Sequence, residues 1–390
     1  MNAFDERLKT LETQMNERFG DRDGPSFYRA PGRVDVMGSH TDYNEGFILA
    51  STVDRDIVAA ARKREGGVIN LYSVDTDLEV RVNADHLKYD KTHEWANYPK
   101  GVIHELLELK APFTGMDMVV SGEVPIGGNL SSSAALEAVT CEAALGLFDH
   151  EIPQWEKVQL CWRAESVFVG MPCGIMDQFT VIMGEEDKGL FLDCRTLDYE
   201  TVPLAMEGVG LAVIGSGIGR ELVSSKYSER VDECRAAVKK LKALGHKVKA
   251  LRDADLDMVE GAKDELGDVL YRRAKHVIGE NQRVADAAET LRSGDAKKLG
   301  LIMEAGYASC RDDYENSAPE LDVLHDLALS AEGVLGVRIA GAGWGGALLA
   351  LVLNDAIDSL ESGIKEEYRK KTGNDCEVWP VRPSAGSGPL

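Results

Sequence analysis

The chain has 390 residues, 44% of them hydrophobic, and its 44 basic and 66 acidic residues give a formal net charge of −22. This length predicts two or three domains, and the excess of negative charge argues against nucleic acid or an anionic membrane as a partner. The seven cysteines are widely spaced without a CxxC pair, and no run of about 18 apolar residues occurs. We therefore expect a cytoplasmic protein with reduced thiols.

The first half of the chain mixes strands and helices without strict alternation, which favours an α+β fold. After a charged N-terminal helix, alternating apolar residues and turn sequences predict strands over 27–36, 47–62, 68–73, 78–83, 116–121 and 189–194. Helices are predicted over 99–109, after the serines at 131–133, and over 154–169.

The second half begins near Pro203, so we expect two domains, residues 1–203 and residues 204–390. It is predicted to contain a strand over 210–215, several helices between 221 and 330, a strand–glycine turn–strand unit over 337–353, a helix over 356–371 and a strand over 376–382. The terminal GSGPL sequence predicts a loose tail.

The segment over 124–138, VPIGGNLSSSAALEA, leads from a glycine turn through three serines into a helix, because apolar residues recur at helical spacing from Leu136 to Leu147. The unpaired N–H groups at such a helix start bind anions. Gly127 and Gly128 also allow the backbone to approach a ligand closely. A simple serine N-cap after a glycine turn explains the segment equally well when it is considered by itself.

The loop over 30–46, APGRVDVMGSHTDYNEG, crowds polar side chains that include Arg33, Asp35, His40 and Asp42. Carboxylate, imidazole and amide groups at this density suit a polyol, since each hydroxyl needs a donor and an acceptor. A polar turn is the alternative interpretation.

A third polar segment, over 161–180, places Glu165 near the end of a predicted helix and Asp177 in a loop or at a helix start. An aspartate among apolar residues acts as a base or electrostatic anchor when a cation such as Arg33 is close, although helix capping is the commoner role. The glycine turn GAGWGG over 341–346 fits either phosphate approach or a tight hairpin. None of these glycine segments is a Walker loop, which excludes P-loop chemistry.

These segments, in this order and spacing, resemble galactokinases, a branch of the GHMP small-molecule kinases. The matching sequences are APGRVDVMGSHTDYNEG, WANYPKGV, VPIGGNLSSSAALE, AESVFVGMPCGIMDQF, LFLDCRTL, SSKYSERVDEC, SCRDDYENSAPELDVL and GAGWGG. The resemblance implies an α+β, two-domain GHMP-kinase fold with the active site in the cleft between the domains. It also implies an ATP-dependent sugar 1-kinase that phosphorylates the anomeric hydroxyl of D-galactose, with ATP as co-substrate, Mg²⁺ as cofactor and no obligate protein partner.

The resemblance also implies a role for each matching residue. Asp177 would take up or orient the proton of the anomeric hydroxyl, and Arg33 would stabilise charge during phosphoryl transfer. Ser133 and Glu165 would bind Mg²⁺, which prefers oxygen ligands. The implied sugar-binding residues are Ser39, His40, Asp42, Gly174 and Tyr227. The implied ATP-binding residues are Ser73, Trp95, Tyr98, Gly127, Gly128, Asn129, Leu130, Ser131, Ser132 and Ser133. Trp95 and Tyr98 equally suit a place in the core.

One departure from the family pattern concerns the sugar, whereas a second affects details more than the class. Ser39 stands where galactokinases usually have a glutamate near the C6 hydroxyl, and Asp35 replaces the usual asparagine. Loss of the carboxylate at residue 39 removes an acceptor for that hydroxyl and removes repulsion against a C6 carboxylate. Galacturonate and L-arabinose therefore remain open as acceptors. A non-enzymatic galactokinase-like sensor is disfavoured, because the SSSAA sequence over 131–135 is intact.

Overall fold

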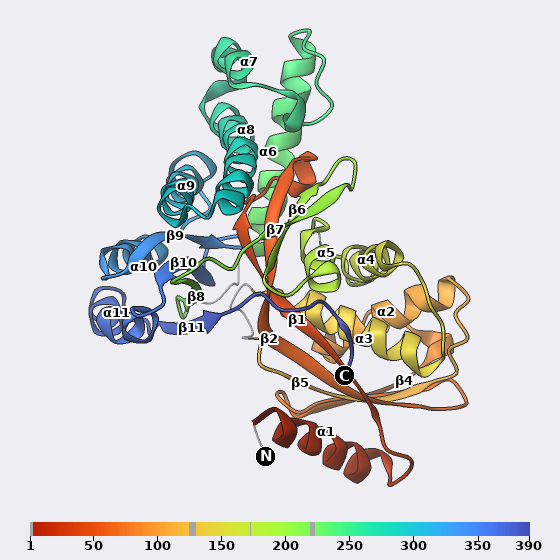
Figure 1. Ribbon diagram of the computed structural model, residues 1–390. Helices are drawn as coiled ribbons and strands as arrows, with labels where there is room; N and C mark the ends of the chain where they lie inside the picture. Colours follow the sequence, from red (N-terminus) through yellow and green to blue (C-terminus); the bar gives the residue numbers. More distant parts are fainter. Residues whose placement is uncertain (1–2, 125–129, 172, 219–222) are drawn as a thin grey trace.

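The computed structural model describes residues 3–124, 130–171, 173–218 and 223–390 (Figure 1). Its first sheet has eight strands, with the order β12-β1-β2-β5-β3-β4 and with β6 joining β2 to β7. These strands are β1 (Ser26–Met37), β2 (Phe47–Lys63), β3 (Val68–Ser73), β4 (Leu78–Asn83), β5 (Met116–Gly122), β6 (Lys188–Asp193), β7 (Tyr199–Pro203) and β12 (Gly388–Pro389).

Helices cover both faces of this sheet, because its strands carry apolar residues on both sides. In β2, Val58 and Ala60 pack with Leu11 of α1 (Ala3–Phe19), whereas Ala59 and Ala61 point into the main core. The main-core face is covered by α2 (Asn97–Glu108), α3 (Ser132–Leu147), α4 (Gln154–Arg163) and α5 (Met176–Met183).

Helix α3 is the central element of this layer. All residues from Ala134 to Leu145 are buried, since the helix packs against β1 and β2 on one side and against α2, α4 and α5 on the others. A helix that is apolar on all sides is stable only in such a place. Its N-terminal end, at the half-buried Ser132 and Ser133, therefore lies next to strand β1.

The second half builds an antiparallel four-stranded sheet in the order β11-β8-β10-β9 and a group of helices that extends away from it in Figure 1. The strands are β8 (Val209–Gly215), β9 (Val334–Ala340), β10 (Ala347–Leu353) and β11 (Glu377–Val381). The helices are α6 (Val223–Ala243), α7 (Leu256–Gly261), α8 (Lys263–Ser293), α9 (Ala296–Ser309), α10 (Pro319–Ser330) and α11 (Ile357–Thr372).

One continuous core joins the two halves, since Leu190 of β6, Leu349 of β10 and Val284 of α8 belong to the same apolar cluster. The chain changes from the first sheet to the second between β7, which ends at Pro203, and β8, which begins at Val209. The domain boundary at residue 203 coincides with this change and stays a prediction.

The predicted strands and helices are found close to their expected bounds, with two differences. The helix expected over 154–169 ends at Arg163, and residues 164–169 form a π-helical turn instead. The loose tail was a wrong expectation, because β12 pairs with β1 and Leu390 N–H donates to the Phe27 carbonyl.

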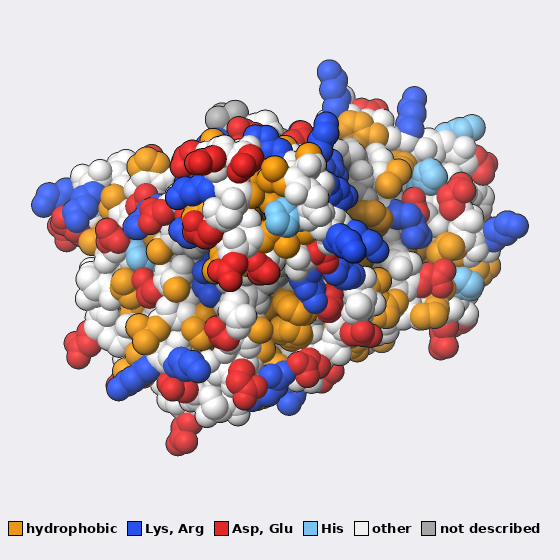
Figure 2. Space-filling model, turned by 90° about the horizontal axis from the view of Figure 1, so that it is seen from above, with side chains coloured by type: hydrophobic (Ala, Val, Ile, Leu, Met, Phe, Trp, Pro, Cys, Tyr) orange, Lys and Arg blue, Asp and Glu red, His pale blue; other side chains and the backbone are white. Residues whose placement is uncertain are grey.

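The surface and the thiols agree with the composition. Acidic and basic side chains are interspersed over the face drawn in Figure 2. All seven cysteines are free, as predicted. Among the described helices, none has the length and apolar character needed to span a bilayer.

Candidate active site

A cavity of about 110 Å³ lies between β1, the start of α5, helix α6 and the glycine turn that joins β9 to β10. Its charged and polar lining comes largely from the loop over 30–46 and from the segment over 161–180, which sequence analysis singled out. Arg33, Asp35, His40, Asp42 and Asp177 all line it.

An ion pair between Arg33 and Asp177 lies on the wall of this cavity. Arg33 Nε donates to Asp177 Oδ1 at 2.7 Å, and the arginine side chain is 6% exposed against 26% for the aspartate. Asp177 is the second residue of α5, so the helix start directs its carboxylate toward β1. The structure thus joins the two predicted catalytic residues, and the aspartate is the more accessible member of the pair.

The serine run reaches the same carboxylate. Ser131 precedes α3 in a left-handed conformation (φ 54°, ψ 52°), and its hydroxyl donates to Asp177 Oδ2 instead of capping the helix. Arg33 N–H donates to the Leu130 carbonyl at 3.0 Å, which ties this helix start to β1. The plain N-cap interpretation therefore does not describe Ser131. The predicted phosphate-loop residues Gly127, Gly128 and Asn129 lie outside the described residues.

Two buried glutamates lie behind Asp177. Gln178 Nε2 donates to Glu165 Oε2 at 2.6 Å and to Glu137 Oε2 at 2.9 Å. Burial and the charge of Asp177 raise the pKa of Glu165 to about 7, and a hydrogen bond with Ser133 acts in the opposite direction. Burial also raises the pKa of Glu137 well above its usual value. Within the described residues neither glutamate forms an ion pair, so these carboxylates gather without a protein cation.

The donor set around Ser133 and Glu165 suits a hard cation, because it consists of oxygen atoms with excess negative charge. Two further buried oxygens, Glu137 Oε1 and Gln178 Oε1, have no hydrogen-bond partner in the described part of the chain. No group of three His, Cys, Asp or Glu side chains in that part is placed to hold a metal ion by itself. A cation here would take its other ligands from hydroxyls, water or phosphate oxygens.

Asp42 and Gly174 form the opposite side of the cavity. A Cβ atom on Gly174 would lie 1.5 Å from Asp42 Oδ2, so only glycine leaves room for this carboxylate. Tyr43 N–H donates to Asp42 Oδ1 at 2.9 Å. Burial raises the pKa of Asp42 to about 6.

The His40 side chain lines the cavity with both ring nitrogens already bonded. Because the Ala342 carbonyl can only accept, Nε2 donates to it at 2.9 Å, and Nδ1 accepts from the Tyr43 hydroxyl at 2.8 Å. Burial lowers the pKa of His40 to about 3, so the ring is neutral at physiological pH. Its ring lies 5.3 Å from that of Tyr227, centroid to centroid, and Tyr227 also lines the cavity.

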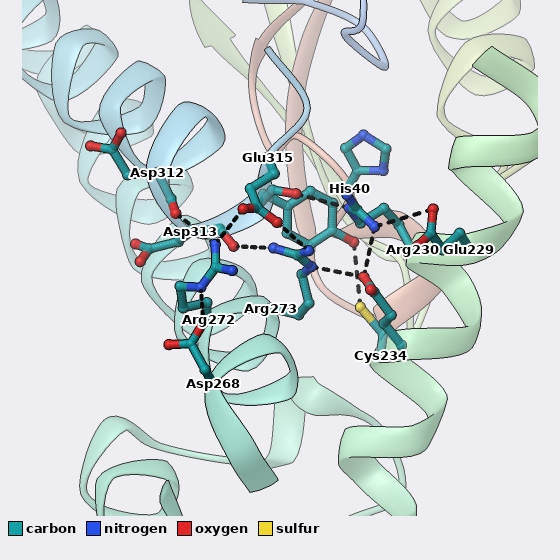
Figure 3. Close-up of polar contacts among 12 residues, drawn as sticks. His40, Glu229, Arg230, Cys234, Asp268, Arg272, Arg273, Asp312, Asp313 and Glu315 are labelled. Atoms are coloured by element: carbon teal, nitrogen blue, oxygen red, sulfur yellow. Dashed lines mark hydrogen bonds and ion pairs between the residues drawn. The ribbon is translucent and has the colours of Figure 1, made fainter. Parts of the chain in front are cut away.

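A hydrogen-bonded chain supports His40 from the second half of the protein (Figure 3). The hydroxyls of Tyr43 and Tyr314 lie 2.5 Å apart, and Arg230 Nε donates to the Tyr314 carbonyl at 2.9 Å. The buried Arg273 donates to Glu315 Oε2 at 2.6 Å and fixes the turn that carries Tyr314. Arg230 lies in SSKYSERVDEC, and Tyr314 and Glu315 lie in SCRDDYENSAPELDVL, two segments for which sequence analysis gave no supporting role. Arg273 belongs to α8, outside every segment that sequence analysis singled out.

A second buried network holds the loop over 30–46 from behind. Arg338 of β9 is fully buried, and its Nη2 lies 3.2 Å from Glu280 Oε1 and 3.5 Å from Asp35 Oδ2. Glu280 Oε1 also accepts from the N–H groups of Gly38 and Ser39, at 3.0 Å each.

The charges of this network set the pKa values of its two acids. Burial by itself would raise the pKa of Glu280. The guanidinium groups of Arg338 and Arg283 outweigh this effect and hold that pKa well below its usual range. Burial, only partly offset by Arg338, raises the pKa of Asp35 to about 6. Sequence reasoning missed Glu280 and Arg338. The one available signal was a charged residue inside the apolar strand sequence VRIAG.

The predicted binding residues Ser39, Ser73, Trp95 and Tyr98 do not line this cavity, and neither do those at the start of α3, Leu130, Ser131, Ser132 and Ser133. Ser39 is buried, and its carbonyl lies 3.1 Å from His276 Nε2. The Ser73 hydroxyl accepts from Thr76 N–H at 3.3 Å. Trp95 and Tyr98 pack against the main core. Their assignment to the nucleotide or the sugar stays a prediction.

Comparison with known families agrees with this geometry. The profile of the GHMP kinases N terminal domain matches residues 97–185, and that of the GHMP kinases C terminal domain matches residues 287–370. A galactokinase galactose-binding signature matches residues 14–63. The fold and the site thus define a GHMP kinase, an ATP-dependent phosphotransferase.

Individual relatives narrow the assignment. The chain is 37% identical to the galactokinase of Fusobacterium nucleatum subsp. nucleatum over 92% of this chain and 93% of that one. It is also 37% identical to the galactokinase of Chloroflexus aurantiacus, over 98% and 97% of the two chains. The chain belongs to the galactokinase family.

Solved structures show the same fold. The crystal structure of Lactococcus lactis galactokinase complexed with galactose superimposes with a TM-score of 0.94 at 32% identity, covering 98% of this chain and 100% of that chain. The crystal structure of Methanococcus jannaschii mevalonate kinase also shares the fold. It superimposes with a TM-score of 0.66 at 17% identity, covering 94% of this chain and 100% of that chain.

Proposed function

We propose that this enzyme transfers the γ-phosphoryl group of ATP to the anomeric hydroxyl of D-galactose, giving galactose 1-phosphate and ADP. The observation that carries this proposal is the ion pair of Arg33 and Asp177 on the cavity wall, joined to the serine that precedes α3. The galactose-binding signature over 14–63 includes the loop with Arg33 and Asp42 and supports galactose as the acceptor.

Asp177 is the group that receives or orients the proton of the attacking hydroxyl. Asp177 is the more accessible partner of the ion pair and lines the cavity. Arg33 holds this carboxylate in place and offsets negative charge that develops beside it. In phosphoryl transfer the protein mainly positions the reactants and stabilises charge, so these two side chains suffice for the acceptor side.

ATP and Mg²⁺ belong on the side of α3. The N-terminal N–H groups of this helix favour phosphate oxygens, and Ser133 with Glu165 would hold Mg²⁺. When bound, Mg²⁺ neutralises charge on the phosphates. The Glu165 carboxylate is buried, and within the described residues it accepts a hydrogen bond from Gln178 but forms no ion pair, which supports this role.

The sugar side consists of Asp42, Gly174, Tyr227 and His40. Asp42 accepts hydrogen bonds from sugar hydroxyls, and Gly174 leaves space for its carboxylate. Since both ring nitrogens of His40 are engaged, His40 shapes the cavity with its ring and backbone. Galacturonate and L-arabinose are not favoured as acceptors, because the relatives at 36–37% identity are galactokinases.

The test is a coupled ADP-release assay with ATP, Mg²⁺ and, separately, D-galactose, D-galacturonate and L-arabinose. We expect the highest kcat/KM with galactose. Asp177→Asn should lower kcat by about 10²- to 10⁴-fold with little change in galactose binding. Asp198→Asn, at an exposed carboxylate of the first half, is the matched control and should behave as wild type. Near-native turnover of Asp177→Asn would refute the assignment.

A further inference from the structure

Asp35 has no role in the proposal above, yet its environment is that of a ligand-binding group. It lies on β1 two residues after Arg33, so both side chains project from the same face of the strand. Its side chain is fully buried and lines the same cavity as Asp42 and Asp177. Among the described residues, no donor forms a hydrogen bond with either of its carboxylate oxygens.

The nearest cation compensates the charge of Asp35 without satisfying its oxygens. Arg338 Nη2 lies 3.5 Å from Asp35 Oδ2, and the guanidinium donates instead to Glu280 and to the carbonyl of Val36. A carboxylate has about four acceptor positions, and leaving them empty in a buried place is costly. A group of this kind at the wall of a binding cavity indicates that the ligand supplies the donors.

We propose that Asp35 binds the sugar directly, by accepting a hydrogen bond from a hydroxyl other than the one that is phosphorylated, and that it makes the site select neutral over anionic sugars. This inference rests on the proposed sugar-kinase function.

The charge of the cavity supports the second part of the proposal. Three carboxylates, of Asp35, Asp42 and Asp177, line the cavity, whereas Arg33 is the one cation among the lining residues and Arg338 lies behind Asp35. His40 adds no positive charge, because its ring is neutral. In a buried site such an excess of negative charge repels a uronic acid strongly, whereas sugar hydroxyls donate to it.

A purely structural role is the competing explanation, in which Asp35 serves only as a counter-ion of Arg338. Two variants separate the explanations. Asp35→Asn keeps the size and one acceptor but removes the charge, and Asp35→Ala removes both. Asp56→Asn is the matched control, since Asp56 is a buried carboxylate of the neighbouring strand β2, paired with Arg7 and Arg29 and placed outside the cavity.

The experiment measures kcat and KM at saturating ATP for galactose, for its 2-, 3-, 4- and 6-deoxy analogues and for galacturonate. We expect Asp35→Ala to raise the KM for galactose by about 10- to 100-fold, the loss typical of a charged hydrogen bond, with the KM for ATP unchanged. One of the deoxy sugars lacks the hydroxyl that Asp35 is proposed to bind. For this sugar, Asp35→Ala and wild type should have similar KM values. Asp35→Asn should shift the galactose-to-galacturonate ratio of kcat/KM toward galacturonate by about tenfold.

The proposed hydrogen bond is refuted if Asp35→Ala leaves the KM for galactose unchanged, or if it raises the KM equally for all four deoxy sugars. The proposed selectivity is refuted if Asp35→Asn leaves the galactose-to-galacturonate ratio of kcat/KM unchanged. Thermal unfolding verifies that each variant is folded. If Asp35→Ala does not fold, Asp35→Asn decides, because a structural counter-ion role predicts lower stability with unchanged sugar selectivity. Failure of the proposed function is recognised separately, since wild type would then show no galactose-dependent ADP release.

Discussion

Substitution of Gly174 by alanine tests how closely the two sides of the sugar site are fitted together. The added Cβ would lie 1.5 Å from Asp42 Oδ2 and 2.2 Å from its Cγ, whereas ordinary contact begins at 3.4 Å. The carboxylate must therefore move by about 2 Å, and it is the flexible end of a side chain that yields. We expect the protein to fold and to lose the position of Asp42.

The magnitude follows from the hydrogen bonds that Asp42 then no longer makes. A hydrogen bond to a charged group contributes about 1.5–3 kcal/mol, which corresponds to a rise of about 10- to 100-fold in the KM for galactose. The KM for ATP should stay unchanged, since the displaced group lies on the sugar side. Steady-state kinetics with each substrate varied in turn provides the measurement.

Two comparisons make the result decisive. Gly363→Ala, in α11, adds a Cβ that meets nothing within 4 Å and should leave both KM values as in wild type. In an Asp42→Ala background, Gly174→Ala should have almost no further effect, because the group it displaces is already absent. A folded Gly174→Ala variant with a galactose KM within about twofold of wild type would refute the reasoning.

Three further outcomes are expected. The value of kcat/KM for galactose should fall as the pH is lowered through about 6. Burial raises the pKa of Asp42 to about 6, so this carboxylate then binds a proton. A flat profile between about pH 5 and 8 would contradict this prediction. Glu280→Gln should lower the free energy of unfolding by about 3–5 kcal/mol in urea titrations, since it leaves buried arginines without their carboxylate, whereas the exposed Glu366→Gln should change it by less than about 0.5 kcal/mol. Ser131→Ala should lower kcat with little effect on stability, because its hydroxyl donates to Asp177 and does not cap α3; a loss of stability with unchanged kcat would argue for a capping role.

The fold could be predicted largely because its elements are encoded locally. Apolar runs mark β2, apolar alternation marks β3, and the largely apolar sequence from Ala134 to Leu145 marks a helix buried on all sides. The π-helical turn over 164–169 was missed, since it differs from an α-helix only in its hydrogen bonds. The pairing of β12 with β1 was missed because a short glycine-rich ending carries no strand pattern.

The site shows the same division between local and distant information. Arg33, Ser131 and Asp177 lie in short polar segments that are conspicuous in the sequence, and the structure places them in contact. Contacts between distant residues leave no such pattern. Arg338 approaches Glu280 across 58 positions, and its bond to the Val36 carbonyl spans 302 positions.

Position 39 illustrates the limit of comparing residues one at a time. Sequence comparison directed attention to Ser39 as the departure that re-shapes the sugar site. In the structure the buried Ser39 does not line the cavity, whereas the other departure, the equally buried Asp35, is among the residues that line it.

The pairing of β1 with the C-terminal residues has a consequence for synthesis of the protein. The strand that carries Arg33 has β2 on one side, and on the other it is joined by β12, while Arg29 reaches Ala385 across 356 positions. On the ribosome this edge emerges long before its partner does. An open strand edge is a site for unwanted pairing between chains. Until Gly388 and Pro389 have been made, Tyr28 and Arg29 lack their strand partner, so the nascent chain carries an open edge at this place.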